Sequence, residues 1–283
     1  MKPLPRISIV TPSFNQADFI EEALASVKAQ NYPDYEHLVM DGLSKDGTVE
    51  LLQRATFDSV QAQLFWVSEL DAGQSEAMNK GFKRATGDIV GWLNSDDRYR
   101  PGCFERVVQT FEDNPQVDIV YGDYLTVKED GTPVQIRREI EFSPFILLYH
   151  RVLYIPTTTT FIRRRIFEEG NYLDETLQYA MDLDFFLRLA ARGYRFKHIP
   201  HILADFRLQP KSKTCTSPDR QHQEHQQIIN SMAPSLRYLR SPYLKKTVLA
   251  FLRILAAGKR YSEKMFKGYY WEQLRDTADR SRT

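Results

Sequence analysis

Two adjacent carboxylates, Asp96 and Asp97, follow an apolar run from Ile89 to Leu93. A strand that ends there would place both acids at the edge of a sheet rather than in a core. Neighbouring carboxylates repel each other, so the pair is easier to hold where a divalent cation or several donors compensate. Oxygen ligands of this kind suit Mg²⁺ or Mn²⁺, which could in turn hold a diphosphate. An ordinary turn stays open as the alternative, because Asn94 and Ser95 are typical turn residues.

Three earlier segments repeat one order of short apolar strand, polar loop and amphipathic helix. Apolar runs predict strands over residues 7–10, 37–40, 65–67 and 89–93, and helices follow the first three around residues 19–27, 49–52 and 77–82, the first one starting at Asp18. Strands that alternate with helices predict an α/β fold with a mainly parallel sheet. Ligands bind beyond the carboxyl ends of such strands. Since Thr11, Asp41, Asp71 and Asp96 fall at or just after these ends, we expect a nucleotide-type pocket there.

The second half of the chain has a more mixed pattern. It predicts a strand pair over residues 119–124 and 135–137 around a turn at 129–131, a strand over 156–161, and a helix from about Asp182 to Arg192. We expect residues 1–215 to form the main domain, with its halves at about 1–100 and 101–215. Residues 216–283 then form a helical C-terminal extension.

Composition and charge exclude several classes of protein. With 42% hydrophobic residues the chain can build a packed core, and a net charge of +1 lacks the basic field that nucleic-acid binding needs. Cys103 and Cys215 have no metal-ligand spacing, which favours a cytoplasmic protein with free thiols. The apolar run at residues 7–10 is too short for a signal peptide, and no apolar stretch reaches the roughly 18 residues of a membrane span.

The end of the chain is distinctly basic. Residues 237–283 contain 12 Lys and Arg against 4 Asp and Glu. A predicted helix over 243–255 carries an apolar stripe among these charges, which fits a surface that lies on anionic lipid at the inner face of the cell membrane. Packing of the same stripe against the main domain is an equally open alternative.

Together these motifs resemble family-2 glycosyltransferases. The likeness covers roughly residues 5–214 and rests on three segments in the expected order, residues 7–15, 39–48 and 71–97. Asp71-Ala72-Gly73-Gln74-Ser75, followed by the acidic segment at 91–97, resembles bacterial enzymes of cell-surface polysaccharide assembly. The resemblance implies a GT-A type fold, a nucleotide-diphosphate sugar donor, a Mg²⁺ or Mn²⁺ ion and inversion at the anomeric carbon.

The resemblance also implies roles for particular residues. Asp41 would accept a hydrogen bond from the imide N–H of the base, for which UDP is the favoured nucleotide, although a turn before Gly42 remains an alternative for it. Asp96 would bind the cation, while Asn94 stands where the family has a further acid. Gln209 replaces a frequent His, which puts a third metal ligand in doubt. The full set expected at the donor is Thr11, Pro12, Asn15, Asp41, Asp71, Gln74, Asn94, Asp97 and Arg207.

Transfer needs a base as well as a cation. In an inverting displacement a carboxylate takes the proton of the attacking hydroxyl. The resemblance places this base at Asp182, although Met181 stands where many relatives have Glu. Asp184 is a rival for the role, and a helix N-cap is an alternative for Asp182. Arg207, Lys211 and Lys213 could pair with the diphosphate, or could form a solvated basic loop.

We expect the protein to add one sugar to a saccharide or to a polyprenyl-diphosphate-linked saccharide. Processive members of the family usually carry a Gln, Arg and Trp cluster and membrane helices, which this sequence lacks. A sugar nucleotidyltransferase is a rival, but it would have a glycine-rich basic loop near the first strand, and residues 11–15 contain neither glycine nor charge. A non-catalytic carbohydrate-binding protein is a third possibility.

Overall fold

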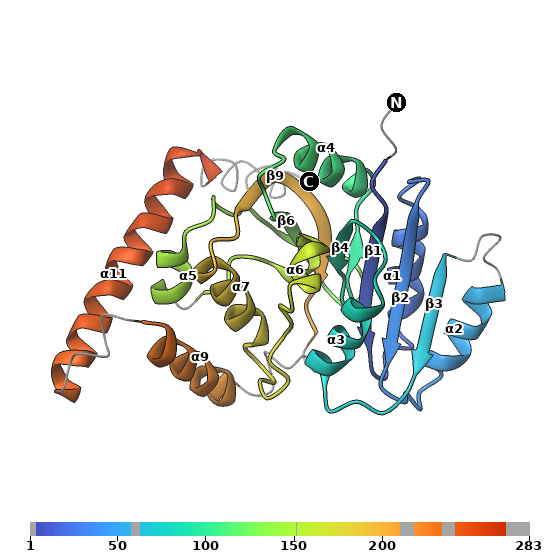
Figure 1. The fold of residues 1–283 in the computed structure, drawn as a ribbon, viewed down its shortest axis with the longest axis horizontal. Coiled ribbons are helices and arrows are strands. Elements are labelled where there is room, and N and C mark those ends of the chain that lie inside the picture. Colours follow the sequence, from blue (N-terminus) through green and yellow to red (C-terminus); the bar gives the residue numbers. More distant parts are fainter. Residues whose placement is uncertain (1–3, 58–62, 151, 210–217, 234–240, 270–283) are drawn as a thin grey trace.

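The computed structural model describes residues 4–57, 63–150, 152–209, 218–233 and 241–269. It is an α/β structure built on one nine-stranded sheet, in the order β3-β2-β1-β4-β8-β6-β9-β5, with β7 paired to β6 (Figure 1). This confirms the predicted α/β fold, and the strands of the first half, residues 1–100, form its mainly parallel part.

The first half is a regular series of strand, loop and helix. Its elements are β1 (Ile7–Ser13), α1 (Ile20–Lys28), β2 (Tyr35–Asp41), α2 (Thr48–Phe57), β3 (Leu64–Ser68), α3 (Gln74–Arg84) and β4 (Ile89–Trp92). Strands β3, β2, β1 and β4 are mutually parallel. Their carboxyl ends therefore meet at one edge of the sheet, as the sequence pattern predicts.

The second half mixes parallel and antiparallel strands. Its elements are β5 (Arg98–Tyr99), α4 (Cys103–Asp113), β6 (Ile119–Val127), β7 (Pro133–Arg137), α5 (Pro144–His150), η1 (Thr157–Thr159), β8 (Phe161–Arg163), α6 (Arg165–Glu168), α7 (Met181–Ala191), β9 (Phe196–Arg207), α9 (Pro218–Met232) and α11 (Pro242–Phe266). β8 runs antiparallel to both β4 and β6, whereas β9 runs parallel to β6. Thus β8 joins the two parallel parts into a single sheet.

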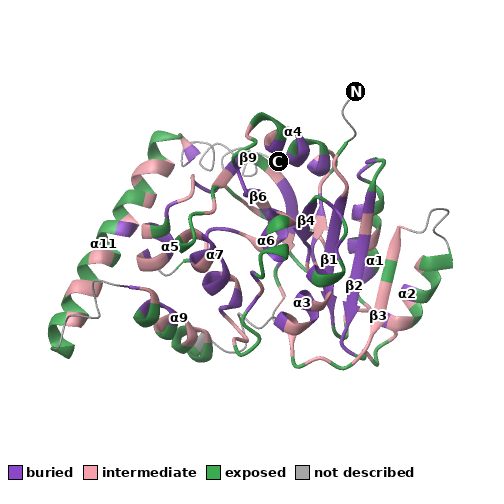
Figure 2. Cartoon of the chain, viewed as in Figure 1, coloured by how far each residue is buried: buried purple, intermediate pink, exposed green. Residues whose placement is uncertain are grey.

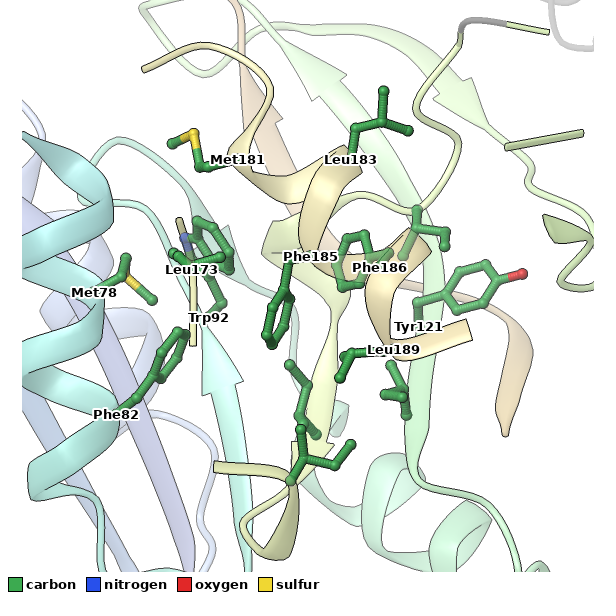
Figure 3. Packing of buried hydrophobic residues seen from close by; sticks show 14 of the residues in the cluster. Met78, Phe82, Trp92, Tyr121, Leu173, Met181, Leu183, Phe185, Phe186 and Leu189 are labelled. Atoms are coloured by element: carbon green, nitrogen blue, oxygen red, sulfur yellow. The ribbon is translucent and has the colours of Figure 1, made fainter. Parts of the chain in front are cut away.

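The largest apolar cluster lies between α3, α7 and the central strands, where buried residues are concentrated (Figure 2). The rings of Phe82 and Phe167 stack at 4.2 Å, and Phe82 meets Trp92 edge-on. Phe185 and Phe186 of α7 join the same layer (Figure 3). The inner face of α7 is thus fixed by close packing, which gives its first turn a defined place relative to the sheet.

Three local predictions were wrong. The strand expected over 156–161 is a 3₁₀ turn, η1, followed by the short strand β8, because threonine hydroxyls of η1 make tertiary hydrogen bonds. Helix α1 begins at Ile20 after Phe19, and Asp18 does not cap it. Strand β1 continues to Ser13 through Pro12, because its pairing with β4 ends at Val10 and no ladder bond is required of the proline nitrogen.

Both described helices of the C-terminal extension pack on the domain. Helix α9 contacts α5 and α7, and α11 contacts α5. Arg260 and Lys264 of α11 approach the buried Glu139 carboxylate to 2.9 and 3.5 Å. Within the described part of the chain, no helix has the length and apolar character needed to cross a bilayer.

Candidate active site

Asp41 ends β2 and is the centre of a compact hydrogen-bonded unit. Its Oδ2 accepts bonds from the Ser44 amide at 3.0 Å and from the Ser68 hydroxyl at 2.6 Å, and its Oδ1 accepts one from the Ser44 hydroxyl at 2.5 Å. Ser68 pairs with Asp41 in the sheet register and ends β3. A carboxylate offers about four lone-pair positions, so these three bonds leave one for a further donor.

Asp71 lies directly against the backbone that follows Asp41. A Cβ built on Gly42 would come within 2.7 Å of Asp71 Oδ2, so the Asp71 carboxylate lies close against this glycine. Oδ1 of Asp71 accepts the Gly73 amide at 2.9 Å. Burial raises the pKa of Asp71, and the nearby charge of Asp41 adds to this rise. The structure thus brings these two predicted acids together.

Thr11, Pro12 and Asn15 lie at the end of β1 and in the loop that follows it. Thr11 and Pro12 are buried within β1, and the Thr11 hydroxyl bonds to His37 Nε2 at 2.9 Å. Burial lowers the pKa of His37 to about 3, so this ring is neutral. Asn15 has a φ of 52°, and its Oδ1 accepts the Lys45 amide at 2.9 Å. Thr11 therefore ties β1 to β2, and Asn15 ties the loop after β1 to the loop after β2.

A chain of side-chain amides connects the Asp71 loop to the acidic segment. Gln74 donates to Asn94 Oδ1 at 3.1 Å, and Trp92 Nε1 donates to the same oxygen at 3.1 Å. Asn94 in turn donates to Asp97 Oδ2 at 3.2 Å. Asn94, which stands where the family has an acid, thus serves as a hydrogen-bonding link.

Asp97 is buried beneath Asp96. It is 2% exposed, and it accepts bonds from the Thr158 hydroxyl, from Asn94 and from the Arg207 amide. Burial raises the pKa of Asp97 well above its ordinary value, and the charge of Asp96 raises it further. Burial also raises the pKa of Asp96. Both shifts show that two negative charges are costly here, which is the condition that a bound cation relieves.

Arg207 ends β9 and Gln209 follows it, and both bind Asp96. The Arg207 guanidinium, 1% exposed, binds the Asp96 carbonyl through Nε at 2.9 Å and the Glu22 carboxylate through Nη2 at 2.6 Å. It also binds the carbonyl of Glu129. Gln209 donates to Asp96 Oδ2 at 2.7 Å. Lys211 and Lys213, expected near a diphosphate, lie outside the described residues.

Few side chains near Asp96 could bind the expected cation, but they are of a suitable kind. Among the described residues there is no group of three or more His, Cys, Asp or Glu side chains that could hold a metal. Asp96 is partly exposed, and Gln209 turns its amide nitrogen, not its oxygen, toward Asp96 Oδ2. Mg²⁺ is commonly held by one or two carboxylates together with substrate phosphates and water. The residues present fit a cation of this kind.

Asp182 occupies the first turn of α7. The N-cap of this helix is Ala180, so the alternative of Asp182 as N-cap was wrong, and its Oδ1 instead accepts the Leu183 amide at 2.7 Å. Burial and the charge of Glu224 raise the pKa of Asp182 to about 6. The rival base, Asp184, is 8% exposed and paired with Arg188 at 2.7 Å.

The segment before Asp182 touches the Asp71 loop. Gln178 donates to the Ala72 carbonyl at 3.4 Å, and Ser75 donates to the Leu177 carbonyl at 3.1 Å. Gly73 has a φ of +136°, and a Cβ there would lie 2.6 Å from the Gln178 amide oxygen. Asp71 and the turn that carries Asp182 are therefore parts of one connected region.

Sequence reasoning missed several residues of this region. Ser68 could have been found, because it ends a strand next to the one that ends at Asp41. The other three carry no local signal, since each acts through a tertiary contact: Thr158, Gln178 and Glu224.

Relatives and solved structures resemble this chain over most of its length. The chain is 28% identical over 207 residues to "Putative teichuronic acid biosynthesis glycosyltransferase TuaG" of Bacillus subtilis (strain 168), which covers 72% of this chain and 79% of TuaG. The crystal structure of S. aureus TarS 1–349 in complex with UDP-GlcNAc has a TM-score of 0.64 at 18% identity, covering 87% of this chain and 71% of TarS 1–349. The mannosyltransferase PcManGT of Pyrobaculum calidifontis, in complex with GDP-Man and Mn²⁺, has a TM-score of 0.61 at 19% identity, covering 91% of this chain and 74% of the other.

These structural likenesses establish the fold, which is of the GT-A type. The resemblance inferred from the sequence motifs is confirmed by the family comparison, and the nucleotidyltransferase and non-catalytic alternatives lose their basis. Residues 8–170, more than half of the chain, match glycosyl transferase family 2, and the protein is a glycosyltransferase of that family.

Proposed function

We propose that this glycosyltransferase inverts the anomeric centre as it moves one sugar from a UDP-sugar to a saccharide or lipid-linked saccharide during cell-surface polysaccharide assembly. One observation carries the proposal: a continuous set of contacts joins Asp41, Asp71, Asp96 and the turn of Asp182. The names of TuaG and of the TarS complex support the pathway class and the nucleotide.

The donor base is recognised at Asp41. Three donors already fix its carboxylate, and the remaining lone-pair position suits the imide N–H of uracil. Asp71 stands beside it to contact the base or the ribose. Thr11 and Pro12, which are buried in β1, and Asn15, which binds the Lys45 amide, support this part of the site.

Asp96 would hold the Mg²⁺ or Mn²⁺ ion, together with the phosphates of the donor and water. A bound cation stabilises the negative charge that develops on the leaving diphosphate. The Mn²⁺ complex of PcManGT supports a cation in this fold. The Arg207 guanidinium already binds Glu22 and the Asp96 and Glu129 carbonyls, so we revise its expected contact with the diphosphate and assign it to holding the Asp96 segment. Asp97, buried to nearly the same degree as Asp41, remains a proposed neighbour of the donor sugar.

Asp182 is the base. Its carboxylate takes the proton of the acceptor hydroxyl while the acceptor oxygen bonds to C1 of the sugar and the bond from C1 to the diphosphate oxygen breaks. A carboxyl pKa of about 6 makes it a stronger base than an ordinary Asp, yet leaves it mostly ionised near neutral pH. In this proposal residues 1–215 are the catalytic domain, with a donor half at about 1–100 and an acceptor half at about 101–215, and residues 216–283 are the extension.

The extension supplies a contact to an anionic membrane surface. One side of α11 binds Glu139 through Arg260, which lies two and a half turns from Phe251 and so on the opposite side of the helix. The opposite side presents an exposed apolar stripe of residues spaced by three, four or seven positions: Leu244, Phe251, Ile254, Leu255, Tyr261 and Met265. Exposed basic side chains border it at Lys246 and Lys259, whereas Arg253 and Lys267, each seven residues from Arg260, lie on the side of Arg260. An apolar stripe with basic flanks fits the headgroup region of anionic lipid, where a lipid-linked acceptor would be found.

A panel of nucleotide sugars tests the donor and the cation together. We expect UDP and one UDP-sugar to raise the melting temperature of the protein with Mn²⁺ or Mg²⁺, and chelator to remove much of this rise. Asp96→Asn should show the same weak response with and without cation. No stabilisation by any nucleotide under any cation would contradict the proposal.

A further inference from the structure

Glu224, on helix α9 of the C-terminal extension, binds the backbone immediately before the proposed base. Its Oε1 accepts the Gln178 amide at 3.0 Å, and its Oε2 accepts the amides of Tyr179 and Ala180, each at 2.8 Å. Helix α7 begins one residue later, at Met181. One carboxylate from a distant helix thus satisfies three successive amides that lead into α7.

This contact replaces a local cap. The N-cap position of α7 is Ala180, whose side chain offers no acceptor, and no side chain caps the helix from that position. Amides at a helix start lack partners within the helix, and negative charge is favourable there because of the helix dipole. Bonds from amides to a carboxylate are charge-assisted and so stronger than neutral ones. The conformation of residues 178–180 therefore depends on Glu224.

Helix α9 holds Glu224 in position by burying the adjacent turn. Ile228 and Ile229 are 4% and 1% exposed, and α9 contacts both α5 and α7. Glu224 and Ile228 are four residues apart, so they share one face of the helix. The carboxylate is thus presented to the 178–180 segment by a packed helix rather than by a loop.

The segment of residues 178–180 connects the loop that carries Asp71 to the proposed base, Asp182. Gln178 reaches the Ala72 carbonyl, and Ala180 is two residues before Asp182. We propose that Glu224 is a positioning residue, which sets the place of Asp182 relative to the donor through the backbone of residues 178–180. This inference rests on the proposed function, because it assigns Glu224 a part in the reaction only if Asp182 is the base.

The charge of Glu224 has a second effect on the same group. Among the described residues, it is the charged group that raises the pKa of Asp182, in addition to burial, while the Leu183 amide opposes the rise. Removing this charge should therefore lower the pKa of Asp182. A role confined to folding would not move that pKa, so the pH profile distinguishes the two roles.

The test compares Glu224→Ala and Glu224→Gln with Gln223→Ala, a change at an exposed neighbour on the same helix. All three are made in the wild-type protein and in Asp182→Asn. In the wild type, both Glu224 variants should lower kcat roughly 10- to 100-fold with little change in donor KM, because misplacement of about 1 Å is costly. Gln223→Ala should leave kcat unchanged. In Asp182→Asn, the Glu224 variants should cause no further loss, since there is no base left to position.

Two further readouts complete the test. In Glu224→Gln, the acidic limb of the kcat/KM profile for the acceptor should move to lower pH, and amide hydrogen exchange at residues 178–180 should speed up. Wild-type kcat in both Glu224 variants, or an equal loss in the Asp182→Asn background, would overturn the proposal. Full transfer by Asp182→Asn would instead show that the proposed base is wrong, and the role of Glu224 would be rejected with it.

Discussion

The Arg207 amide donates to Oδ1 of Asp97 at 2.9 Å and so ties the end of β9 to the loop after β4. The Arg207 side chain adds bonds to the Asp96 carbonyl and to Glu22. Arg207 therefore links the last strand of the domain to its first helix and to the proposed cation ligand.

Arg207→Met tests this link. The change leaves the Asp96 and Glu129 carbonyls without their partner, so we expect a loss of about 1–3 kcal/mol in the free energy of unfolding. UDP affinity in the presence of Mn²⁺ should fall as well, because Asp96 is less well held. Denaturant titration and calorimetry measure the two effects. Arg106→Met, at an exposed arginine, is the control, and equal behaviour of the two variants would contradict the role.

Asp41→Asn should weaken UDP binding roughly 10- to 100-fold, the worth of a hydrogen bond to a charged group. The amide cannot accept from the base imide and from all three present donors. Ser68→Ala removes one of those donors but keeps the carboxylate, so it should have a much smaller effect. Isothermal calorimetry with UDP decides the matter, and an undiminished affinity of Asp41→Asn would place the base elsewhere.

The pH dependence of kcat/KM for the acceptor should show an acidic limb with an apparent pKa near 6. A base must be ionised to act, so activity is full above the raised pKa of Asp182 and is lost as the pH falls through it. Values of kcat/KM for the acceptor at saturating donor from pH 4 to 8, about two units on either side of that pKa, would show this limb. A flat profile across this window would argue against Asp182.

Phe251→Glu with Ile254→Glu should reduce binding to vesicles that contain an anionic lipid. The two substitutions place charge in the exposed stripe of α11, while the ion pairs to Glu139 remain. Phe57→Glu, at a phenylalanine 91% exposed on α2, is the matched control. Vesicle co-sedimentation measures the effect, and added salt should weaken binding of the wild type. Equal sedimentation of all three proteins would rule out this surface.

The first half of the fold, residues 1–100, could be predicted from the sequence because its strands and loops show local sequence patterns. Short apolar runs ended by polar residues gave β2 and β4, and parallel strands must bring their carboxyl ends together, so Asp41 and Asp96 could be assigned to one edge. The end of β1 was predicted too early, at Val10, because proline usually ends a strand. Here Pro12 stays in β1, since the pairing with β4 ends at Val10 and no N–H is needed at residue 12.

The rest depends on contacts that no local pattern shows. The three threonines of η1 favour a strand by propensity, but the hydroxyls of Thr158 and Thr159 bind Asp97 and Gly122, which overrides that preference. Glu224 looks like any charged residue on a polar helix, and only the packing of α9 brings it to the start of α7. Burial of Arg207 is equally invisible, since a basic residue near a predicted diphosphate site suggests direct contact.

The most direct test of the account is the transfer rate of Asp182→Asn, measured together with its affinity for UDP. We predict that transfer falls by about 10²- to 10⁴-fold, the contribution of a general base, while UDP affinity stays at the wild-type value. Transfer at the wild-type rate would contradict the central claim that Asp182 takes the acceptor proton beside a donor held at Asp41 and Asp96.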